Sequence, residues 1–250
     1  MISSEGFNGR EEKLREIIRF NMKRFTPMFY RTNLFFHAQR VYLLVEDMLP
    51  SVLPVYDGEL DPEKALTLTL VHDDAEIITG DVQLYHKDRM TPEELAKIDE
   101  QEAEAIEELA RSWPQEINGF SYKGLLYHAL KKDCLEAQVV SYADKVDAFC
   151  ECLHELHAGN KLFIGPAINY IKIIKAFPDK FPSLAKMLPT KHPLLVLPDE
   201  LDIGEIVENG GIHSQESIGR KTGLPYYDRW KELTIRYIGV EPLITIKENN

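Results

Sequence analysis

The sequence predicts an all-α protein. Apolar residues recur at the three- and four-residue spacing of an amphipathic helix along most of the 250-residue chain. Several of these stretches also begin at residues that favour helix starts and stop at Gly or Pro. Hydrophobic residues make up 44% of the composition, which is enough for the helices to enclose a substantial core.

The first two helices are expected over residues 9–25 and 33–49. In the second of these, apolar side chains at helical spacing surround His37 in the second turn, and Pro50 ends the run. The stretch 50–61 is rich in turn signals and separates this helix from the next one.

The third helix is expected over residues 62–79, and both of its ends carry clear signals. Asp61 is a suitable N-cap, Pro62 fits the first helical position, and Gly80 fits the position after the last turn. The helix is apolar on much of its surface, so we expect it to be buried.

An unusual pair, His72-Asp73, lies inside this apolar helix. Asp is rarely buried unless it is paired or bound to a cation. On a continuous helix Glu76 shares a face with both residues, and Asp81 follows just past the helix end. Three acids packed this closely repel one another unless a cation or a proton lies among them.

Three further helices are expected over residues 92–112, 121–133 and 136–158. The first opens with a capping box, and we expect its acid-rich run, Glu93–Glu108, to form a solvated face. Asp144 lies near the apolar stripe of the last helix, where a carboxylate needs a partner.

The pattern changes after residue 165. Prolines punctuate short segments, Asn209-Gly-Gly211 is a strong turn, and helical periodicity returns only at 167–176 and 226–237. We therefore expect one domain over residues 1–165 and an extension of mixed short helices and loops over 166–250. The extension is too apolar to be a disordered tail, and it could wrap the core, cover the active site or form a subunit interface.

A metal site is the interpretation that the joint pattern favours. A single His on an apolar face is more often a bonded core residue, and a single Asp can pair with Arg. Here a His, a His-Asp pair and an Asp each stand on a separate amphipathic helix. Two imidazoles and two carboxylates suit Mn, Fe, Co, Ni or Zn better than Ca. The candidate ligands are His37, His72, Asp73 and Asp144.

These four residues match the H…HD…D signature of HD-domain phosphohydrolases. The string H-D-x-x-E-x-x-x-G-D over residues 72–81, and the Ala158-Gly-Asn160 segment after Asp144, most resemble the YfbR-like bacterial 5'-deoxynucleotidases. The likeness covers roughly residues 15–165. It implies an HD-domain helical bundle that uses one divalent transition metal to remove phosphate from nucleotides, foremost 5'-deoxyribonucleoside monophosphates.

The resemblance also implies roles for single residues. Asp73 would bind the metal at the centre of catalysis, and Glu76 would orient or deprotonate the attacking water. Arg24 would bind phosphate, Phe25 would lie near the sugar, and Asp81 would contact the sugar hydroxyls. Such a set is chemically sufficient for phosphate ester hydrolysis.

The chain departs from the family pattern near its N-terminus. Phe25 stands where the deoxynucleotidases have Trp, and the spacing from Arg24 to His37 is one residue short. These departures leave the metal ligands intact, but they affect the sugar and base preference. Lys23 and Arg31 are alternatives to Arg24 as the phosphate ligand.

Composition bounds the partners. The net charge of −12 argues against nucleic-acid binding as the main role, so local cations such as Arg24, Arg31 and Lys145 must attract an anionic nucleotide. No stretch approaches the roughly 20 apolar residues of a membrane span. The absence of a signal-peptide pattern and an odd count of three cysteines favour a reduced, cytoplasmic protein. A homodimer is expected from the resemblance only.

Two classes of function remain open. The first is the metal-dependent phosphohydrolase, with Mn, Co, Zn, Ni or Fe preferred to Mg and with nucleoside triphosphates as alternative substrates. The second is a regulatory HD protein that binds nucleotide or metal without turnover. A degenerate protein commonly loses ligands or the catalytic acid, whereas this chain keeps the ligands, Glu76 and Asp81.

Overall fold

The computed structural model describes residues 6–20, 28–81, 90–196 and 221–237, together with residues 202 and 206. Within these residues the regular secondary structure is helical, apart from one isolated β-bridge and one antiparallel ribbon that joins β1 (Glu116–Ile117) to β2 (Phe120–Ser121). The predicted all-α class is therefore confirmed. None of the helices in this part of the chain is long and apolar enough to cross a membrane.

The α-helices have well-separated bounds, and short 3₁₀ helices follow the long ones in the C-terminal third. The α-helices are α1 (Arg10–Glu16), α2 (Leu34–Tyr56), α3 (Pro62–Val71), α4 (Glu76–Thr79), α6 (Pro92–Ser112), α7 (Tyr122–Lys131), α8 (Leu135–His157), α9 (Ile164–Lys180) and α12 (Pro225–Thr234). The 3₁₀ helices are η1 (Lys161–Phe163), η2 (Pro182–Lys186), η3 (Leu188–Thr190), η4 (Pro193–Leu195) and η5 (Ile235–Tyr237).

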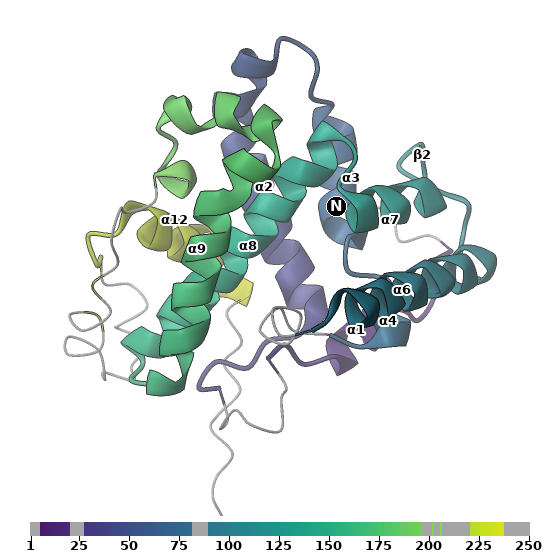
Figure 1. Cartoon of the computed structure of the whole chain (residues 1–250), viewed down its shortest axis with the longest axis horizontal. Coiled ribbons are helices and arrows are strands. Elements are labelled where there is room, and N and C mark those ends of the chain that lie inside the picture. Colours follow the sequence, from purple (N-terminus) through teal and green to yellow (C-terminus); the bar gives the residue numbers. More distant parts are fainter. Residues whose placement is uncertain are drawn as a thin grey trace, which may run out of the picture.

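Helix α8 is the centre of the bundle (Figure 1). It is buried along almost its whole length and packs against α9 on one side and against α2 and α3 on the other. Helices α6 and α7 pack on each other beyond α3, and α12 packs on α2, α8 and η4. The predicted division of the chain at residue 165 stays a prediction.

Local capping explains the helix starts that the sequence predicts well. The Asp61 carboxylate accepts hydrogen bonds from the backbone N–H groups of Glu63 and Lys64 at the start of α3. Thr91 and Glu94 form the predicted capping box of α6, whose bounds equal the predicted 92–112. Helices α7 and α8 differ from the predictions by no more than two residues at either end.

Two predicted helix ends are wrong. The first helix stops at Glu16, because Ile17 turns to an extended conformation and Ile18 pairs with Asn33 in a β-bridge. Helix α2 runs through Pro50 and ends at Tyr56, which is buried and donates its hydroxyl to the Ser183 carbonyl at 2.9 Å. Burial of Val52 and Tyr56 offsets the hydrogen bonds that Pro50 and Pro54 remove.

The helix predicted over residues 62–79 is in fact divided. Helix α3 ends at Val71, residues 72–75 form a turn, and α4 follows. Backbone bonds from Asp74 to Val71 and from Glu76 to Asp73 span three residues instead of four, which tightens the chain into a 3₁₀-like turn. The predicted stop at Gly80 is confirmed by its positive φ of 76°.

A buried ion pair fixes the turn formed by residues 72–75. Arg10 of α1 grips the Asp74 carboxylate with two hydrogen bonds of 2.7 and 2.6 Å, and the Tyr122 hydroxyl donates to the same group at 2.7 Å. Asp74 is almost fully buried, with a side-chain exposure of 1%. The turn that carries His72 and Asp73 is thus fixed against α1 and α7.

Removal of Arg10 is expected to destabilise the fold. Arg10→Ala leaves the Asp74 charge buried beside Tyr122 alone, and the loss of one partner from such a pair costs about 3 kcal/mol of unfolding free energy. Urea unfolding would measure it. Arg15→Ala is the matched control, since Arg15 is an exposed residue of α1 paired with Glu11 and should cost less than about 1 kcal/mol. Equal effects for both variants would contradict the role of the buried pair.

Candidate metal centre

The four predicted metal ligands come from three separate elements and meet in one place. His37 lies on α2, His72 and Asp73 lie in the turn after α3, and Asp144 lies on α8. The His37 Nε2 atom is 3.3 Å from Asp73 Oδ2 and 3.2 Å from Asp144 Oδ1. One ligand atom each from His37, His72 and Asp144 lie within 4.8 Å of one another.

Hydrogen bonds on the far side of each imidazole orient these ligands. The His37 Nδ1 atom is 2.7 Å from Asp147 Oδ2, and the His72 Nδ1 atom is 2.7 Å from the Thr69 carbonyl. Both bonds require a proton on Nδ1, so each Nε2 atom faces the carboxylates. Neither Nε2 atom has a hydrogen-bond partner among the described residues, although both are buried. Two unbonded imidazole nitrogens beside two carboxylates fit a divalent transition metal.

The charges of the ligands match this arrangement. Burial raises the pKa of Asp73, but the adjacent His72 and His37 lower it well below its ordinary value. Burial also raises the pKa of Asp144, but the Lys145 ammonium, 2.5 Å away, and His37 lower it well below its ordinary value. Both carboxylates are therefore ionised at neutral pH and able to bind a cation.

Glu76 differs from these two acids. Its Oε2 atom is buried and has no hydrogen-bond partner among the described residues. Burial, together with the charges of Asp73 and Asp81, raises the pKa of Glu76 well above its ordinary value. Burial also raises the pKa of Asp81, despite the opposing charge of Arg19. This is the crowding of acids that the sequence predicts, but it arises across a tight turn rather than on one helix face.

The predicted phosphate and sugar ligands, Arg24 and Phe25, lie outside the described residues. The arginine that the structure does place at the site is Arg19. It is buried, with its Nη1 atom 3.8 Å from Asp73 Oδ2 and its Nε atom 3.3 Å from Glu151 Oε2. Its backbone N–H donates to the Thr32 carbonyl at 3.1 Å, next to the β-bridge that follows α1.

The sequence contains a signal for this residue that the helix prediction hid. Arg19-Phe20 is the same arginine–aromatic pair as Arg24-Phe25, five positions earlier. Phe20 is buried and meets the Phe163 ring edge-on, with the two ring centroids 5.4 Å apart. The helix expected over residues 9–25 includes Arg19, whereas α1 ends at Glu16 and Arg19 lies beside the candidate ligand Asp73.

A family model described as "5'-deoxynucleotidase YfbR-like" matches residues 7–184. The chain belongs to this family. The matched region contains all the candidate ligands, Glu76, Asp81 and Arg19. The resemblance that the HD signature predicts is therefore confirmed over 178 residues (184 − 7 + 1).

Relatives of this YfbR-like chain carry the same description. It is 33% identical over 108 residues to a 5'-deoxynucleotidase of Vibrio parahaemolyticus, across 43% of this chain and 54% of that protein. A 5'-deoxynucleotidase of Vibrio atlanticus is 35% identical over 109 residues, across 42% and 53% of the two chains. The chain thus spans about half the length of the curated relatives it matches.

A solved structure of a conserved hypothetical protein from Pyrococcus furiosus also matches the YfbR-like chain. The TM-score is 0.47 with 23% sequence identity, and the match covers 68% of this chain and 96% of that one.

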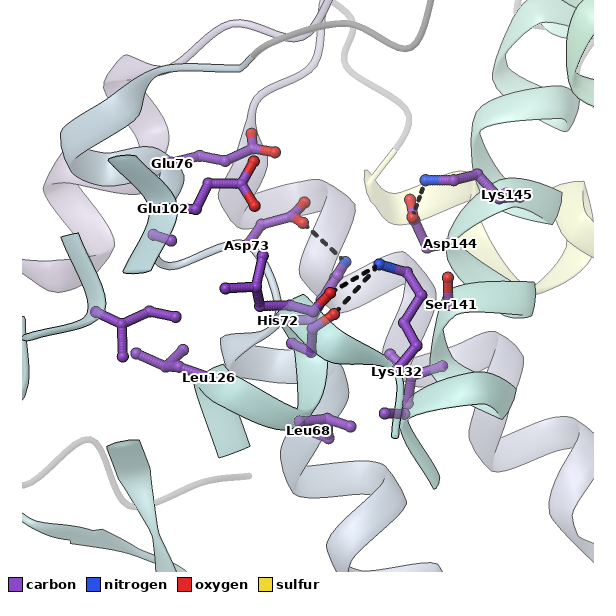
Figure 2. A pocket seen from close by; sticks show the side chains of 16 residues that line it. Leu68, His72, Asp73, Glu76, Glu102, Leu126, Lys132, Ser141, Asp144 and Lys145 are labelled. Atoms are coloured by element: carbon purple, nitrogen blue, oxygen red, sulfur yellow. Dashed lines mark hydrogen bonds and ion pairs between the residues drawn. The ribbon is translucent and has the colours of Figure 1, made fainter. Parts of the chain in front are cut away.

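A cavity of ≈ 130 Å³ opens beside the candidate metal ligands of the YfbR-like chain. Figure 2 shows Glu76 and Glu102 on one side of it, Asp144 and Lys145 on the other, and Lys132 reaching in from below. Glu102 belongs to the acid-rich run of α6 that was expected to be solvated, and that expectation is wrong for this residue, which is half-buried. Neither Glu102 nor Lys132 stands out in the sequence from the charged residues around it.

Metal binding is expected to release protons. Burial and Arg19 lower the pKa of His37, but the carboxylates of Asp144, Asp147 and Asp73 raise it to about 10. The metal-free protein therefore holds a proton on His37 at pH 8, and a metal ligand nitrogen must be unprotonated. Adding Mn²⁺ at pH 8 should release at least one proton per ion, measured with a pH indicator, and the affinity should fall as the pH is lowered. Binding without proton release would contradict a protonated His37.

Proposed function

We propose that this chain is a metal-dependent phosphohydrolase that removes the phosphate from 5'-deoxyribonucleoside monophosphates. The observation that supports it most is the pair of buried imidazole Nε2 atoms that lack hydrogen-bond partners in the described structure and face two carboxylates. His37, His72, Asp73 and Asp144 would hold one divalent transition metal, with Mn, Co, Zn, Ni or Fe preferred to Mg. When bound, the metal would lower the pKa of water and neutralise phosphate charge.

Glu76 would take up the proton of the attacking water. A general base works best when its pKa lies near the working pH, and an ordinary Glu is too acidic for this role. Burial and the charges of Asp73 and Asp81 move the pKa of Glu76 upward, in the required direction. Its Oε2 atom is also not engaged in another hydrogen bond within the described structure, so it can accept one from water.

Arg19 would bind the phosphoryl oxygens. A guanidinium offers several N–H donors in one plane, which match the oxygens of a phosphate. Its position near Asp73 puts these donors next to the metal ligands. Asp81 would contact the sugar hydroxyls, and Arg24 and Phe25 stay predicted contacts of the phosphate and the sugar. A homodimer and a cytoplasmic location stay predictions as well.

Loss of Arg19 is expected to weaken phosphate binding. Arg19→Ala should lower kcat/KM roughly 30- to 1000-fold. This corresponds to a loss of about 2 to 4 kcal/mol of transition-state stabilisation. Metal content, measured by elemental analysis, should stay that of the wild type. Arg31→Ala is the control, because Arg31 is the described alternative that the sequence leaves open. A loss in Arg31→Ala without one in Arg19→Ala would transfer the role to Arg31.

The function itself is tested by phosphate release from a panel of 5'-nucleotides. The panel compares deoxy with ribo sugars and monophosphates with triphosphates, in Mn²⁺, Co²⁺, Mg²⁺ and chelator. Release from deoxynucleoside monophosphates that stops with chelator supports the proposal. Release from triphosphates would move the assignment to the alternative, a nucleoside triphosphate hydrolase. Metal binding without any release would favour the regulatory alternative.

A further inference from the structure

Asp147, one turn after Asp144 on α8, orients the candidate metal ligand His37. Its side chain is completely buried. The Oδ2 atom accepts from His37 Nδ1 at 2.7 Å and from Arg40 Nη2 at 2.8 Å. The Oδ1 atom accepts from Arg40 Nε at 2.8 Å. A carboxylate held in this way fixes both the tautomer and the ring direction of His37.

A further donor to Asp147 comes from the far end of the chain. The indole Nε1–H of Trp230, on α12, donates to Asp147 Oδ1 at 2.6 Å. Trp230 is 1% exposed, and its ring stacks on Tyr227 and lies beside the Arg40 guanidinium. Residue 184 is the last one matched by the family, so α12 lies beyond the matched region.

Helix α12 is fastened to the bundle on both sides of Trp230. The neighbouring Arg229 forms two hydrogen bonds with the Asp47 carboxylate of α2. Just past the helix, the Tyr237 carbonyl accepts from Arg40 Nη1 at 3.2 Å. These contacts fix the position of α12 along its axis and its rotation, and they thereby place the indole N–H within hydrogen-bond distance of Asp147.

We propose that α12 is part of the metal centre and that Trp230 is a positioning residue for it. The indole N–H holds the Asp147 carboxylate, which in turn keeps Nε2 of His37 directed at the metal. Without this N–H, Oδ1 keeps only the Arg40 bond and the carboxylate can rotate away from His37. The inference rests on the proposed metal site, but not on the identity of the substrate.

The test compares metal affinity in Trp230→Phe and in wild type. Phe keeps an aromatic ring in the packing and removes the N–H. Affinity for Mn²⁺ and Co²⁺, measured by competition with a chromophoric chelator, should fall by about 10- to 100-fold, the range for residues that orient a metal ligand. The visible absorption of bound Co²⁺ should change as well, because His37 is displaced. Tyr227→Phe is the control, since it removes a buried hydrogen bond, the one to His154, from a residue that stacks on Trp230 without touching Asp147. This variant should bind metal as the wild type does.

Wild-type metal affinity and an unchanged Co²⁺ spectrum in folded Trp230→Phe would overturn the inference. If thermal unfolding shows that this variant does not fold, benzothienylalanine at position 230 replaces it, because sulfur takes the place of the N–H with little change in ring shape. Equal losses in Trp230→Phe and Tyr227→Phe would also overturn it, since they would indicate a general packing effect. A wild type that binds metal but hydrolyses no nucleotide would refute the proposed function and leave this comparison decisive for Trp230.

Discussion

Asp144→Ala is expected to abolish both metal retention and hydrolysis. Asp144 supplies the ligand oxygen from α8, 3.2 Å from His37 Nε2. Mutation of a residue that only orients a metal ligand lowers metal affinity by about 10- to 100-fold, so removal of a ligand should lower it by more than about 100-fold. Phosphate release should fall to the level seen with chelator. Chelator competition and the nucleotide panel measure the two effects on the same preparation.

The control for this variant is Asp179→Ala, which removes an exposed acid from α9 and should change neither property. Asp73→Ala should behave as Asp144→Ala does, because its two oxygens approach both imidazoles. An Asp144→Ala protein that keeps wild-type metal affinity would show that the ion binds elsewhere. Hydrolysis without metal binding would reject the proposed mechanism as a whole.

Glu76→Gln is expected to separate metal binding from turnover. Gln has the shape of Glu but cannot accept the proton of water, and loss of a general base costs about 100- to 10,000-fold in rate. Glu76 is not among the proposed ligands, so metal affinity should stay close to that of the wild type. Single-turnover phosphate release and chelator competition would show the separation. A Glu76→Gln enzyme with wild-type rates would refute the proposed role.

The same substitution should stabilise the metal-free protein. The folded state raises the pKa of Glu76 above its unfolded value of 4.5, so the folded state holds this proton more tightly. Stability contributed by this group is thus present at low pH and lost as the pH rises toward the folded pKa. Gln removes the titration. Urea unfolding of metal-free Glu76→Gln and wild type should show a gain for the variant that is larger at pH 8 than at pH 5.

Local sequence signals account for the parts of the fold that were predicted well. The side chains of Thr91 and Glu94 each accept a hydrogen bond from the other residue's backbone N–H, and this capping box fixes the start of α6. The break at His72-Asp73 could not be found in this way. It is held by the bond between Arg10 and Asp74, which are 64 positions apart, and no periodicity within residues 62–79 reports such a contact.

The residues of the candidate site likewise fall into those that the sequence marks locally and those that depend on long-range packing. His37, His72, Asp73 and Asp144 could be predicted because a known spacing of residue types marks them. Trp230 could not, since its role depends on where a distant segment packs. The Arg19-Phe20 pair is visible in the sequence, but the helix expected over residues 9–25 gave no reason to prefer it to Arg24-Phe25. Trp230 reads in the sequence as one more apolar position of a helix, and only the structure shows that its N–H reaches a carboxylate 83 positions away.

The three segments that carry the candidate ligands also bear on the integrity of the whole bundle. His37 and Asp144 are 107 positions apart (144 − 37), and His72 lies between them. A cation shared by these residues would act as a cross-link, closing long loops in the chain as a disulfide does and making the unfolded ensemble less favourable. Chelation would then loosen α2, α8 and the turn between α3 and α4 together. Proteolytic sensitivity would rise across all three segments, far beyond the few side chains that touch the ion.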